Sequence, residues 1–341
     1  MNTLRFAAGC TIARATPLRY NSSQSVPLKE AMARIILLGT PEFAIPIFER
    51  VAAEHTVLGV ITQPDQAVGR NRRQLVMPPA KQWALAQGVN VYQPQRLRRA
   101  TALLESLRAQ SPDVLVLAAY GQILREPWLT LAPYGCVGVH ASLLPALRGA
   151  APIAHAILNG LRETGISLMR TDLGMDTGPV IAQKALLIRG DDTTLTLTGR
   201  LAHLAADLLS EVLPDYLADR IQPQPQDDAL VTLAPPLTHA QGEIDWQRPA
   251  DEIDRQVRAL YPWPGAWTRY NGVVVKIHSA SYSEVTADAV PGTVTLRAGA
   301  MLVATGVGSL ILRSVQPAGK RVMSAIDYAN GQRGLVGNRL G

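Results

Sequence analysis

Blocks of apolar residues alternate with amphipathic stretches along residues 34–119. The runs IILLG, TVLGVIT and VLVLAA are continuously apolar, which is typical of strands buried on both faces of a sheet. Between them, PEFAIPIFERVAAE and PPAKQWALAQG have helical spacing. This alternation predicts an α/β fold with a mostly parallel sheet and helices on both faces. Ligands bind such sheets beyond the carboxyl ends of the strands, where we expect residues 120–145 and 172–180.

The pattern changes in the second half of the chain. Prolines and polar residues interrupt helical periodicity between about Asp215 and Thr238, which predicts an interdomain linker. A short helix is expected near 249–260, followed by short glycine-punctuated strands, which predict a small β-barrel. The expected division is an extension (1–31), a catalytic domain (32–214), a linker (215–240) and a C-terminal domain (241–341).

Composition is consistent with this two-domain organisation. The 341 residues exceed the usual size of a single core, and the hydrophobic share of 47% gives ample surface to bury. The apolar runs are much shorter than the roughly 20 residues of a membrane-spanning helix, so no membrane segment is expected. Two cysteines, Cys10 and Cys136, are too few for a disulfide framework and favour a reducing compartment.

The first 31 residues carry half of the net charge of +6. Arg5, Arg14, Arg19 and Lys29 against Glu30 give +3 in this segment. Such a basic, nearly acid-free composition is typical of a mitochondrial transit peptide. Alternatively, the coding start is misassigned and the protein begins at Met32, in front of ARIILLGT. The first interpretation implies the mitochondrial matrix, and the second a bacterial-type cytoplasm.

Two polar side chains are the candidates for chemistry. The stretch LLGTPEF lacks the GxGxxG spacing of a dinucleotide site, so a dinucleotide enzyme is disfavoured. In YGCVGVHASLLPALRGAAP, a strand is expected to end at His140, before a loop of small residues. Asp176 lies in the glycine-flanked turn DLGMDTGPV. Taken singly, a histidine beside an apolar strand and an aspartate in a turn are more often structural than catalytic.

Together, these segments resemble the folate-dependent formyltransferase family. The resemblance rests on His140 leading into SLLP, on Asp176 in an LDTG-like turn 36 residues later (176 − 140), and on AAYGQIL at 118–124. GTPEFA, TQPD, GEIDW, YPWPGAW, QPAGKRVMSA and GNRL extend it from Arg34 to Gly341, most closely to the branch acting on methionyl-tRNA. The resemblance implies a Rossmann-like formyltransferase domain followed by an OB-like β-barrel.

The resemblance also implies a reaction. Members of this branch transfer the formyl group of 10-formyltetrahydrofolate to the α-amino group of methionyl-initiator tRNA, giving N-formylmethionyl-tRNA for translation initiation, without a metal. Protonated His140 would donate to the oxyanion, while Asp176 would keep the imidazole charged and help to move protons. The folate is expected at residues of the SLLP loop and of the AAYGQIL segment: Ser142, Leu143, Leu144, Pro145, Tyr120, Gly121, Gln122 and Leu124.

Gly138 departs from the family pattern. The family places an asparagine two residues before the histidine, as a second oxyanion donor. Loss of one such donor typically lowers turnover about 100- to 1000-fold. We expect a water beside Gly138, or its backbone N–H, to substitute partly. Two alternatives remain open: a tRNA- or folate-binding homologue with impaired catalysis, and a formyltransferase acting on a small amine such as an amino sugar.

Basic residues indicate where tRNA would bind. Arg70, Arg72 and Arg73 lie in a loop that by resemblance contacts the acceptor end, although an isolated basic loop is often only solvated. Arg148, Lys320 and Arg321 are further candidates for phosphate contacts. Trp263 and Trp267 are expected to pack in a core or at a domain interface. The protein is expected to be monomeric.

Overall fold

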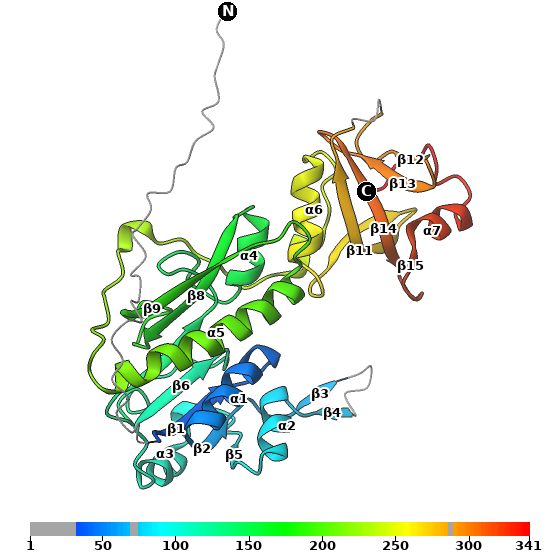
Figure 1. The fold of residues 1–341 in the computed structure, drawn as a ribbon. Coiled ribbons are helices and arrows are strands. Elements are labelled where there is room, and N and C mark those ends of the chain that lie inside the picture. Colours follow the sequence, from blue (N-terminus) through cyan, green and yellow to red (C-terminus); the bar gives the residue numbers. More distant parts are fainter. Residues whose placement is uncertain (1–31, 69–73, 286–288) are drawn as a thin grey trace, which may run out of the picture.

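A computed structural model describes residues 32–68, 74–285 and 289–341 (Figure 1). The expectations for residues 1–31, and those for Arg70, Arg72 and Arg73, lie outside the described residues. In the part of the chain that the structure describes, no helix is long and apolar enough to cross a membrane.

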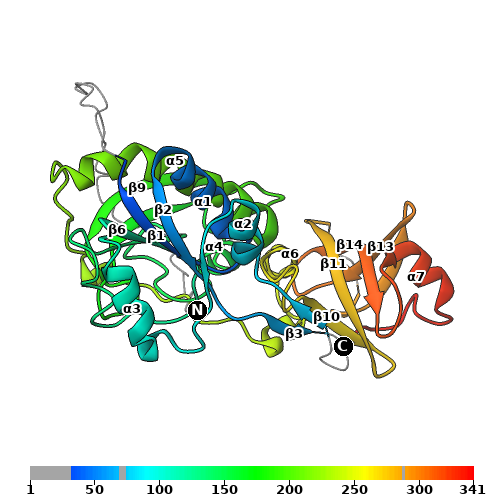
Figure 2. The same cartoon turned by 90° about the horizontal axis from the view of Figure 1, so that it is seen from below.

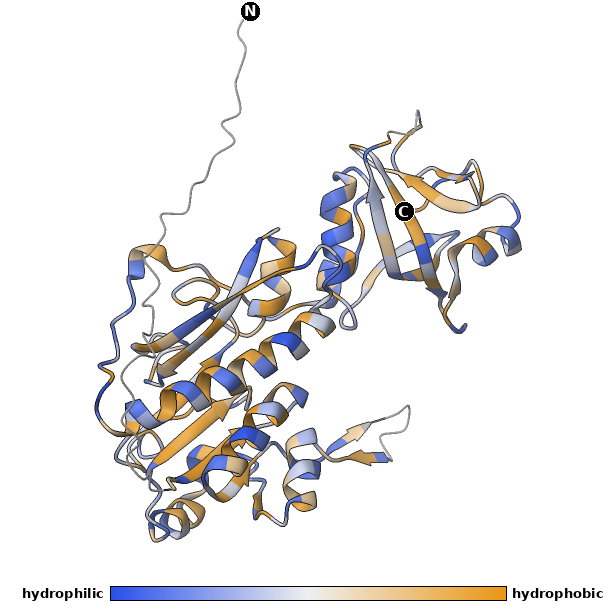
Figure 3. Cartoon of the chain, viewed as in Figure 1, coloured by the Kyte–Doolittle hydropathy of each residue, from blue (hydrophilic) through white to orange (hydrophobic). Residues whose placement is uncertain are grey.

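A seven-stranded sheet forms the centre of the first unit, in the order β5-β2-β1-β6-β7-β8-β9. Its strands are β1 (Arg34–Gly39), β2 (Thr56–Ile61), β5 (Val91–Tyr92), β6 (Val114–Ala118), β7 (Cys136–His140), β8 (Glu163–Arg170) and β9 (Val180–Leu187). The first five are parallel, and β8 is antiparallel to both β7 and β9. The central strands are apolar along their length (Figure 3), because both faces are covered. The predicted mostly parallel sheet is confirmed.

Helices cover both faces of this sheet, as Figure 2 shows from below. One face packs on α1 (Ile45–Glu54), α2 (Pro79–Ala86), α4 (Pro152–Leu158) and α5 (Thr194–Leu217). The other face packs on α3 (Thr101–Arg108) and on the segment from Tyr120 to Ala132. Alternate residues of each strand enter the two cores: Val137 and Val139 belong to the first, and Cys136 belongs to the second. The short 3-10 helices η1 (Glu42–Ala44) and η2 (Leu97–Arg99) precede α1 and α3.

Helix α5 is the last element of the first unit and extends into the region where the linker was expected. A capping box between Thr193 and Thr196 begins it, and a buried apolar stripe that includes Leu201 and Leu209 holds it against the sheet. It continues past Pro214 to Leu217, so the expected start of the linker at residue 215 falls in its last turn. Proline in the last turn is tolerated here because packing of the stripe, rather than propensity, stabilises the helix.

A hairpin of β3 (Gln66–Val68) and β4 (Gln74–Val76) follows β2 and projects away from the seven-stranded sheet (Figures 1 and 2). Asp65 precedes β3, and Lys81 lies in α2 after β4. The Lys81 Nζ atom is 2.7 Å from Asp65 Oδ2, and the Gln93 amide donates to Asp65 Oδ1 at 2.7 Å. These contacts join the two ends of the hairpin at its base.

The connecting segment (residues 218–240) lies against the first unit rather than hanging free. It runs from the end of α5 past β9 and on to α6 (Figure 1). Gln224 pairs with Val180 and Leu233 pairs with Arg148 as isolated β-bridges. The segment includes η3 (Asp228–Leu230). The expectation of a simple linker missed this packing, because its partners are distant in sequence.

The second unit is an antiparallel β domain, as predicted. After η4 (His239–Gly242) and α6 (Ala250–Ala259), its strands pair in the order β10-β11-β14-β13-β12, with β15 added to β14. These strands are β10 (Ala266–Tyr270), β11 (Val273–Ser283), β12 (Val294–Arg297), β13 (Ala300–Ala304), β14 (Ser309–Pro317) and β15 (Met323–Ser324), and α7 (Ala325–Gly331) follows. Register shifts between β11 and β14 around Ser279 are the kind of bulge that bends a sheet.

The C-terminal tail (residues 337–341) joins the two ends of this strand path. On the β12 side, Val294 N donates to Asn338 O at 2.9 Å, and Gly337 N donates to Val294 O at 2.9 Å. On the β10 side, Gly341 N donates to Arg269 O at 2.9 Å. The tail therefore occupies the seam between β10 and β12, which turns an open sheet into a small barrel.

Helix α6 connects the two units. Its Ile253 and Val257 belong to the barrel core, while Ala259 belongs to the core of the first unit. Thr194 Oγ1 donates to Ala259 O at 2.6 Å. The remaining surface of α6 is mostly hydrophilic (Figure 3).

The two tryptophans of YPWPGAW have different environments. Trp267 is buried, and its Nε1 donates to His239 O at 3.3 Å. Trp263 is 62% exposed, so the expectation that it packs in a core or at an interface is wrong. Sequence pattern alone does not distinguish the tryptophan of the strand from that of the preceding turn.

Candidate active site

His140 is the last residue of β7 and is largely buried, with 8% of its side chain exposed. Its Nε2 lies 2.9 Å from Leu147 O. A carbonyl oxygen only accepts hydrogen bonds, so Nε2 carries a proton and donates to it. The second ring nitrogen, Nδ1, is therefore the atom that faces the rest of the site.

Asp176 approaches His140 from the loop between β8 and β9. Its Oδ1 lies 3.5 Å from His140 Nδ1, and its Oδ2 accepts from Gly149 N at 2.8 Å. Asp172 stabilises the turn of this loop, because its Oδ1 accepts hydrogen bonds from Gly174 N at 3.0 Å and from Thr177 Oγ1 at 2.7 Å. The structure thus brings together the two residues that the sequence singled out.

The facing atoms of His140 and Asp176 define a proton position. The two atoms face each other at 3.5 Å, so a proton bound to either one lies within reach of the other. At 3.5 Å the contact is longer than a charge-assisted hydrogen bond. A proton on Nδ1 would therefore not be saturated by Asp176, and a third oxygen could share it.

Gly138 lies on the same face of β7 as His140, two residues earlier. A Cβ atom at this position would lie 2.8 Å from Thr171 Oγ1 and 3.1 Å from Met169 Cε. The Gly138 N–H lies in the sheet plane between β6 and β8, where neighbouring strands use it. The hypothesis that this N–H substitutes for the missing amide is therefore disfavoured. A water at the same place is disfavoured as well, because Thr171 and Met169 fill the space beside Gly138.

The SLLP loop is tied to the protein itself. Ser142 Oγ donates to Ala146 O at 2.6 Å, and Leu144 is hydrogen-bonded to Ser167 Oγ and Gln183 Nε2. Ser142 and Leu144 are buried, whereas Leu143 and Pro145 are half-buried. A folate contact from this loop is thus expected mainly from Leu143, Pro145 and backbone atoms.

The AAYGQIL segment is split between core and surface. Tyr120 and Leu124 are buried in the second core, and burial raises the pKa of the Tyr120 hydroxyl to about 12. The side chain of Gln122 accepts from Leu97 N at 2.9 Å. Gly121 is exposed with a φ of +88°, a conformation that favours glycine. Folate binding by this segment remains a prediction, and the exposed backbone at Gly121 is its most accessible part.

The surroundings of the His140–Asp176 pair fit a planar, partly apolar ligand. Ile123, Leu173 and Met175 are 69%, 65% and 63% exposed, and they belong to the two loops that border the carboxyl end of β7. Large exposed apolar side chains beside a few convergent polar groups are typical of a ligand site.

The guanidinium group of Arg148 is engaged within the protein and is not available to bind a phosphate of a nucleic acid. Only 8% of its side chain is exposed, and it donates to Gln226 Oε1 at 2.9 Å and to Asp228 Oδ1 at 3.0 Å. The expectation that Arg148 binds tRNA is therefore corrected: it holds the connecting segment. Lys320 and Arg321 are both exposed in the turn between β14 and β15, where phosphate can reach them.

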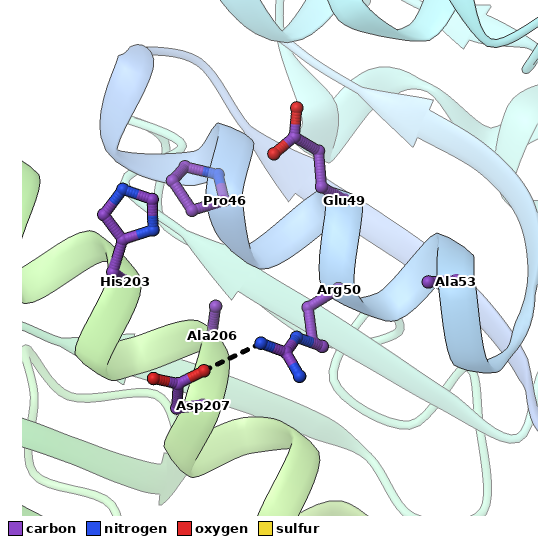
Figure 4. A pocket seen from close by; sticks show the side chains of 7 residues that line it. All are labelled: Pro46, Glu49, Arg50, Ala53, His203, Ala206 and Asp207. Atoms are coloured by element: carbon purple, nitrogen blue, oxygen red, sulfur yellow. Dashed lines mark hydrogen bonds and ion pairs between the residues drawn. The ribbon is translucent and has the colours of Figure 1, made fainter.

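Two surface hollows lie away from these residues. One, shown in Figure 4, lies between α1 and α5, where Arg50 reaches Asp207 at 2.8 Å beside His203. The other is lined by residues that include Tyr134, Arg170 and Tyr216. Neither lining includes His140 or Asp176, and an exposed ion pair is an ordinary feature of helix packing.

Metal and thiol chemistry find no support among the described residues. Within residues 32–68, 74–285 and 289–341, no group of three or more His, Cys, Asp or Glu side chains could hold a metal ion. Cys136 is a buried free cysteine, and burial raises the pKa of its thiol to about 12, which makes it a poor nucleophile.

Comparison with known sequences decides the family. Residues 33–213 match the family described as formyl transferase, and residues 236–333 match the formyl transferase C-terminal domain. The chain belongs to the formyl transferase family. The methionyl-tRNA formyltransferase of Methylococcus capsulatus is 44% identical over 90% of this chain and 99% of its own length. That of a Roseiflexus species is 47% identical over 90% of this chain and 95% of its own.

Solved structures share the fold at lower identity. The N-formyltransferase of Helicobacter canadensis, in complex with folinic acid and dTDP-3-aminofucose, has a TM-score of 0.63 at 17% identity, covering 83% of this chain and 99% of that chain. HypX from Aquifex aeolicus, in complex with tetrahydrofolic acid, has a TM-score of 0.61 at 18% identity, covering 90% and 48%. At these identities the likeness supports the formyl transferase fold alone.

Sequence reasoning missed the residues that hold the pair in place. Leu147 O and Gly149 N contact His140 and Asp176 through the backbone, so their side-chain types carry no signal. Gln226 contacts the Asp176 loop from 50 residues away, and Thr232 contacts Leu147 from 85 residues away. Both lie in a polar stretch that has no periodicity.

Proposed function

We propose that this protein transfers the formyl group of 10-formyltetrahydrofolate to the α-amino group of methionyl-initiator tRNA. The observation that carries the proposal is the contact of His140 Nδ1 with Asp176 Oδ1 at 3.5 Å. The contact occurs in a chain that is 44% identical to a methionyl-tRNA formyltransferase over 309 residues. The formyl donor supplies an activated carbonyl carbon, and the protein supplies orientation and proton transfer.

The roles of the two side chains follow from their hydrogen bonds. When the amine adds to the formyl carbon, its nitrogen must lose a proton, which the Asp176 carboxylate accepts. Negative charge develops on the formyl oxygen, and the unsaturated His140 Nδ1–H donates to it. As the bond to the folate nitrogen breaks, the proton passes to that nitrogen, so charge and protons balance. Leu147 O keeps Nε2–H engaged, which fixes the ring with Nδ1 toward the substrate.

We propose that the two structural units bind different parts of the substrates. The sheet unit, from residue 32 to the end of α5, would hold the folate and the reacting amine. The barrel would bind tRNA, with Lys320 and Arg321 contacting phosphates and the hairpin loop with Arg70, Arg72 and Arg73 contacting the acceptor end. This division supports a tRNA rather than a small amine as substrate, because a small amine needs no basic barrel surface.

The direct test is formylation of charged initiator tRNA with 10-formyltetrahydrofolate. We expect N-formylmethionyl-tRNA to form, and Asp176→Asn to lower kcat about 100- to 10,000-fold, because proton acceptance is lost. Asp207→Asn is the matched control, since Asp207 on α5 pairs with Arg50 on α1, away from His140 and Asp176 (Figure 4). Binding of both substrates without transfer would favour the impaired homologue.

Salt dependence separates the tRNA from a small amine. For the tRNA reaction we expect KM to rise steeply between 50 and 200 mM salt, by about tenfold or more, because phosphate contacts release counterions. Lys320→Ala with Arg321→Ala should reduce that slope. Transfer to an amino-sugar nucleotide with a KM that barely changes with salt would instead support the small-amine alternative.

A further inference from the structure

Gln226, in the connecting segment, contacts both loops of the site with one side-chain amide. Its Nε2 donates to Asp176 O at 2.8 Å and to Gly178 O at 2.7 Å. Its Oε1 accepts from Arg148 Nε at 2.9 Å. The amide therefore uses both donor hydrogens on the Asp176 loop and its acceptor on the loop that follows His140.

The rest of the connecting segment fixes the same loop by backbone pairing. Arg148 N donates to Thr232 O at 2.9 Å, and Ala234 N donates to Arg148 O at 2.8 Å. Leu147 N donates to Thr232 Oγ1 at 2.9 Å. Arg148 completes the connection through its contact with Asp228. The loop at 147–149 is thus held on one side by the connecting segment along its whole length.

These two loops determine how the reacting side chains are oriented. Leu147 O receives the His140 Nε2–H, and Gly149 N donates to Asp176 Oδ2. Asp176 also has a φ of +57°, which is unfavourable for a residue with a Cβ and persists only where surrounding contacts hold it. The hydrogen bond from Gln226 to the Asp176 carbonyl is such a contact.

We propose that Gln226 is a positioning residue that holds Asp176 against His140. The inference rests on the proposed function, because its effect is on the formyl transfer step. Gln226 touches neither substrate. It acts through the backbone of Asp176 and through Arg148, and it lies on the segment that leads directly into the tRNA-binding barrel of the proposal.

The test is Gln226→Glu, which has the same shape but replaces the donor with an oxygen. The new oxygen would face the carbonyls of Asp176 and Gly178, while the contact with Arg148 is kept. We expect kcat to fall about 10- to 100-fold, because small displacements of reacting groups have effects of that size. KM for both substrates should change less than about threefold, since no substrate contact is lost.

Gln224→Glu is the matched control. Gln224 lies two residues earlier on the same segment, and its amide donates to Gln222 O at 2.8 Å within that segment. This control keeps the same change of charge away from the two loops. We expect kcat within about twofold of the unsubstituted protein, because exposed substitutions have small effects.

Amide hydrogen exchange provides a measurement that does not depend on turnover. In Gln226→Glu the Gly149 amide, which donates to Asp176 Oδ2, should exchange faster, while the global unfolding temperature stays near that of Gln224→Glu. A kcat equal to that of the control overturns the inference. A fall in kcat that accompanies a general loss of protection also overturns it, because the role is then only structural.

The two proposals fail differently. Absence of transfer by the unsubstituted protein overturns the proposed function, and this inference with it. Normal transfer by the unsubstituted protein together with normal transfer by Gln226→Glu overturns only the positioning role.

Discussion

Position 138 illustrates how one strand residue limits the chemistry available beside His140. A side chain there would point to the same side of the sheet as the imidazole, which is where a second oxyanion donor is useful. In this chain Thr171 Oγ1 and Met169 Cε occupy the space in which that side chain would begin. The positions of Thr171 and Met169 are therefore compatible with glycine at 138 and leave no space for a larger side chain.

We predict that Gly138→Asn raises turnover only when Thr171 yields space. The single variant should gain little and lose thermal stability, because its Cβ would lie 2.8 Å from Thr171 Oγ1. Combining it with Thr171→Ala removes that contact, and kcat should rise about tenfold or more, up to the roughly 100- to 1000-fold effect of one oxyanion donor. Formylation kinetics check this, with Thr171→Ala alone as control. A double variant no faster than this control would contradict the prediction.

Arg148 shows what residue type alone cannot predict. An arginine in a glycine-containing loop suggests a phosphate contact, but its partners Gln226 and Asp228 lie 78 and 80 residues further along the chain. His140 and Asp176 could be predicted because each lies in a short sequence motif, the first before SLLP and the second in the LDTG-like turn. The contacts through Leu147 O and Gly149 N could not, because any side chain can accompany a backbone hydrogen bond.

At the scale of elements, the β3–β4 hairpin depends on a small polar cluster at its base. Hydrogen bonds from Gln93 and Lys81 hold the pKa of Asp65 below its ordinary value of 3.8. A carboxyl group whose pKa is lower in the folded state stabilises the fold above its unfolded pKa. That contribution is lost as the pH falls below 3.8 and through the folded value.

We predict that Asp65→Asn lowers the thermal unfolding temperature at pH 7, and that the difference from the unsubstituted protein shrinks below about pH 3.8. Loss of the ion pair with Lys81 should also raise KM for tRNA, because the base of the hairpin loosens. Glu105→Gln, in an exposed pair with Arg108 on α3, is the control. A difference that is constant from pH 7 to pH 3 would rule out the carboxylate as its source.

Elements with a strong local hydrophobic pattern could be predicted from the sequence. Elements whose position depends on tertiary contacts could not. Continuous apolar runs predicted β1, β2 and β6, because strands buried on both faces need them. The expected start of the linker at residue 215 falls inside α5, since packing of the buried stripe of this helix overrides the local preference at Pro214. The polar composition of the connecting segment suggested a linker, and only the folded chain shows which loops it contacts.

At the scale of the whole molecule, two routes connect the barrel with the catalytic pair. Helix α6 packs between the two cores, and the connecting segment passes from α5 along the reacting loops to η4 and α6. Gln226 and Thr232 lie on that second route, and they contact the loops at 147–149 and 174–178. The composition-based division into two domains does not reveal these contacts.

The tail that occupies the barrel seam has a consequence for self-association. A strand edge with unpaired N–H and C=O groups is a template for another chain, and residues 337–341 cover such groups on β12 and on β10. We predict that deleting 337–341 converts a monodisperse protein into dimers and larger aggregates, measured by light scattering. Leu340→Ala, which retains the backbone but loses a buried side chain, should lower stability by about 2–5 kcal/mol without promoting assembly. A truncated protein that stays monodisperse would show that these edges are protected in another way.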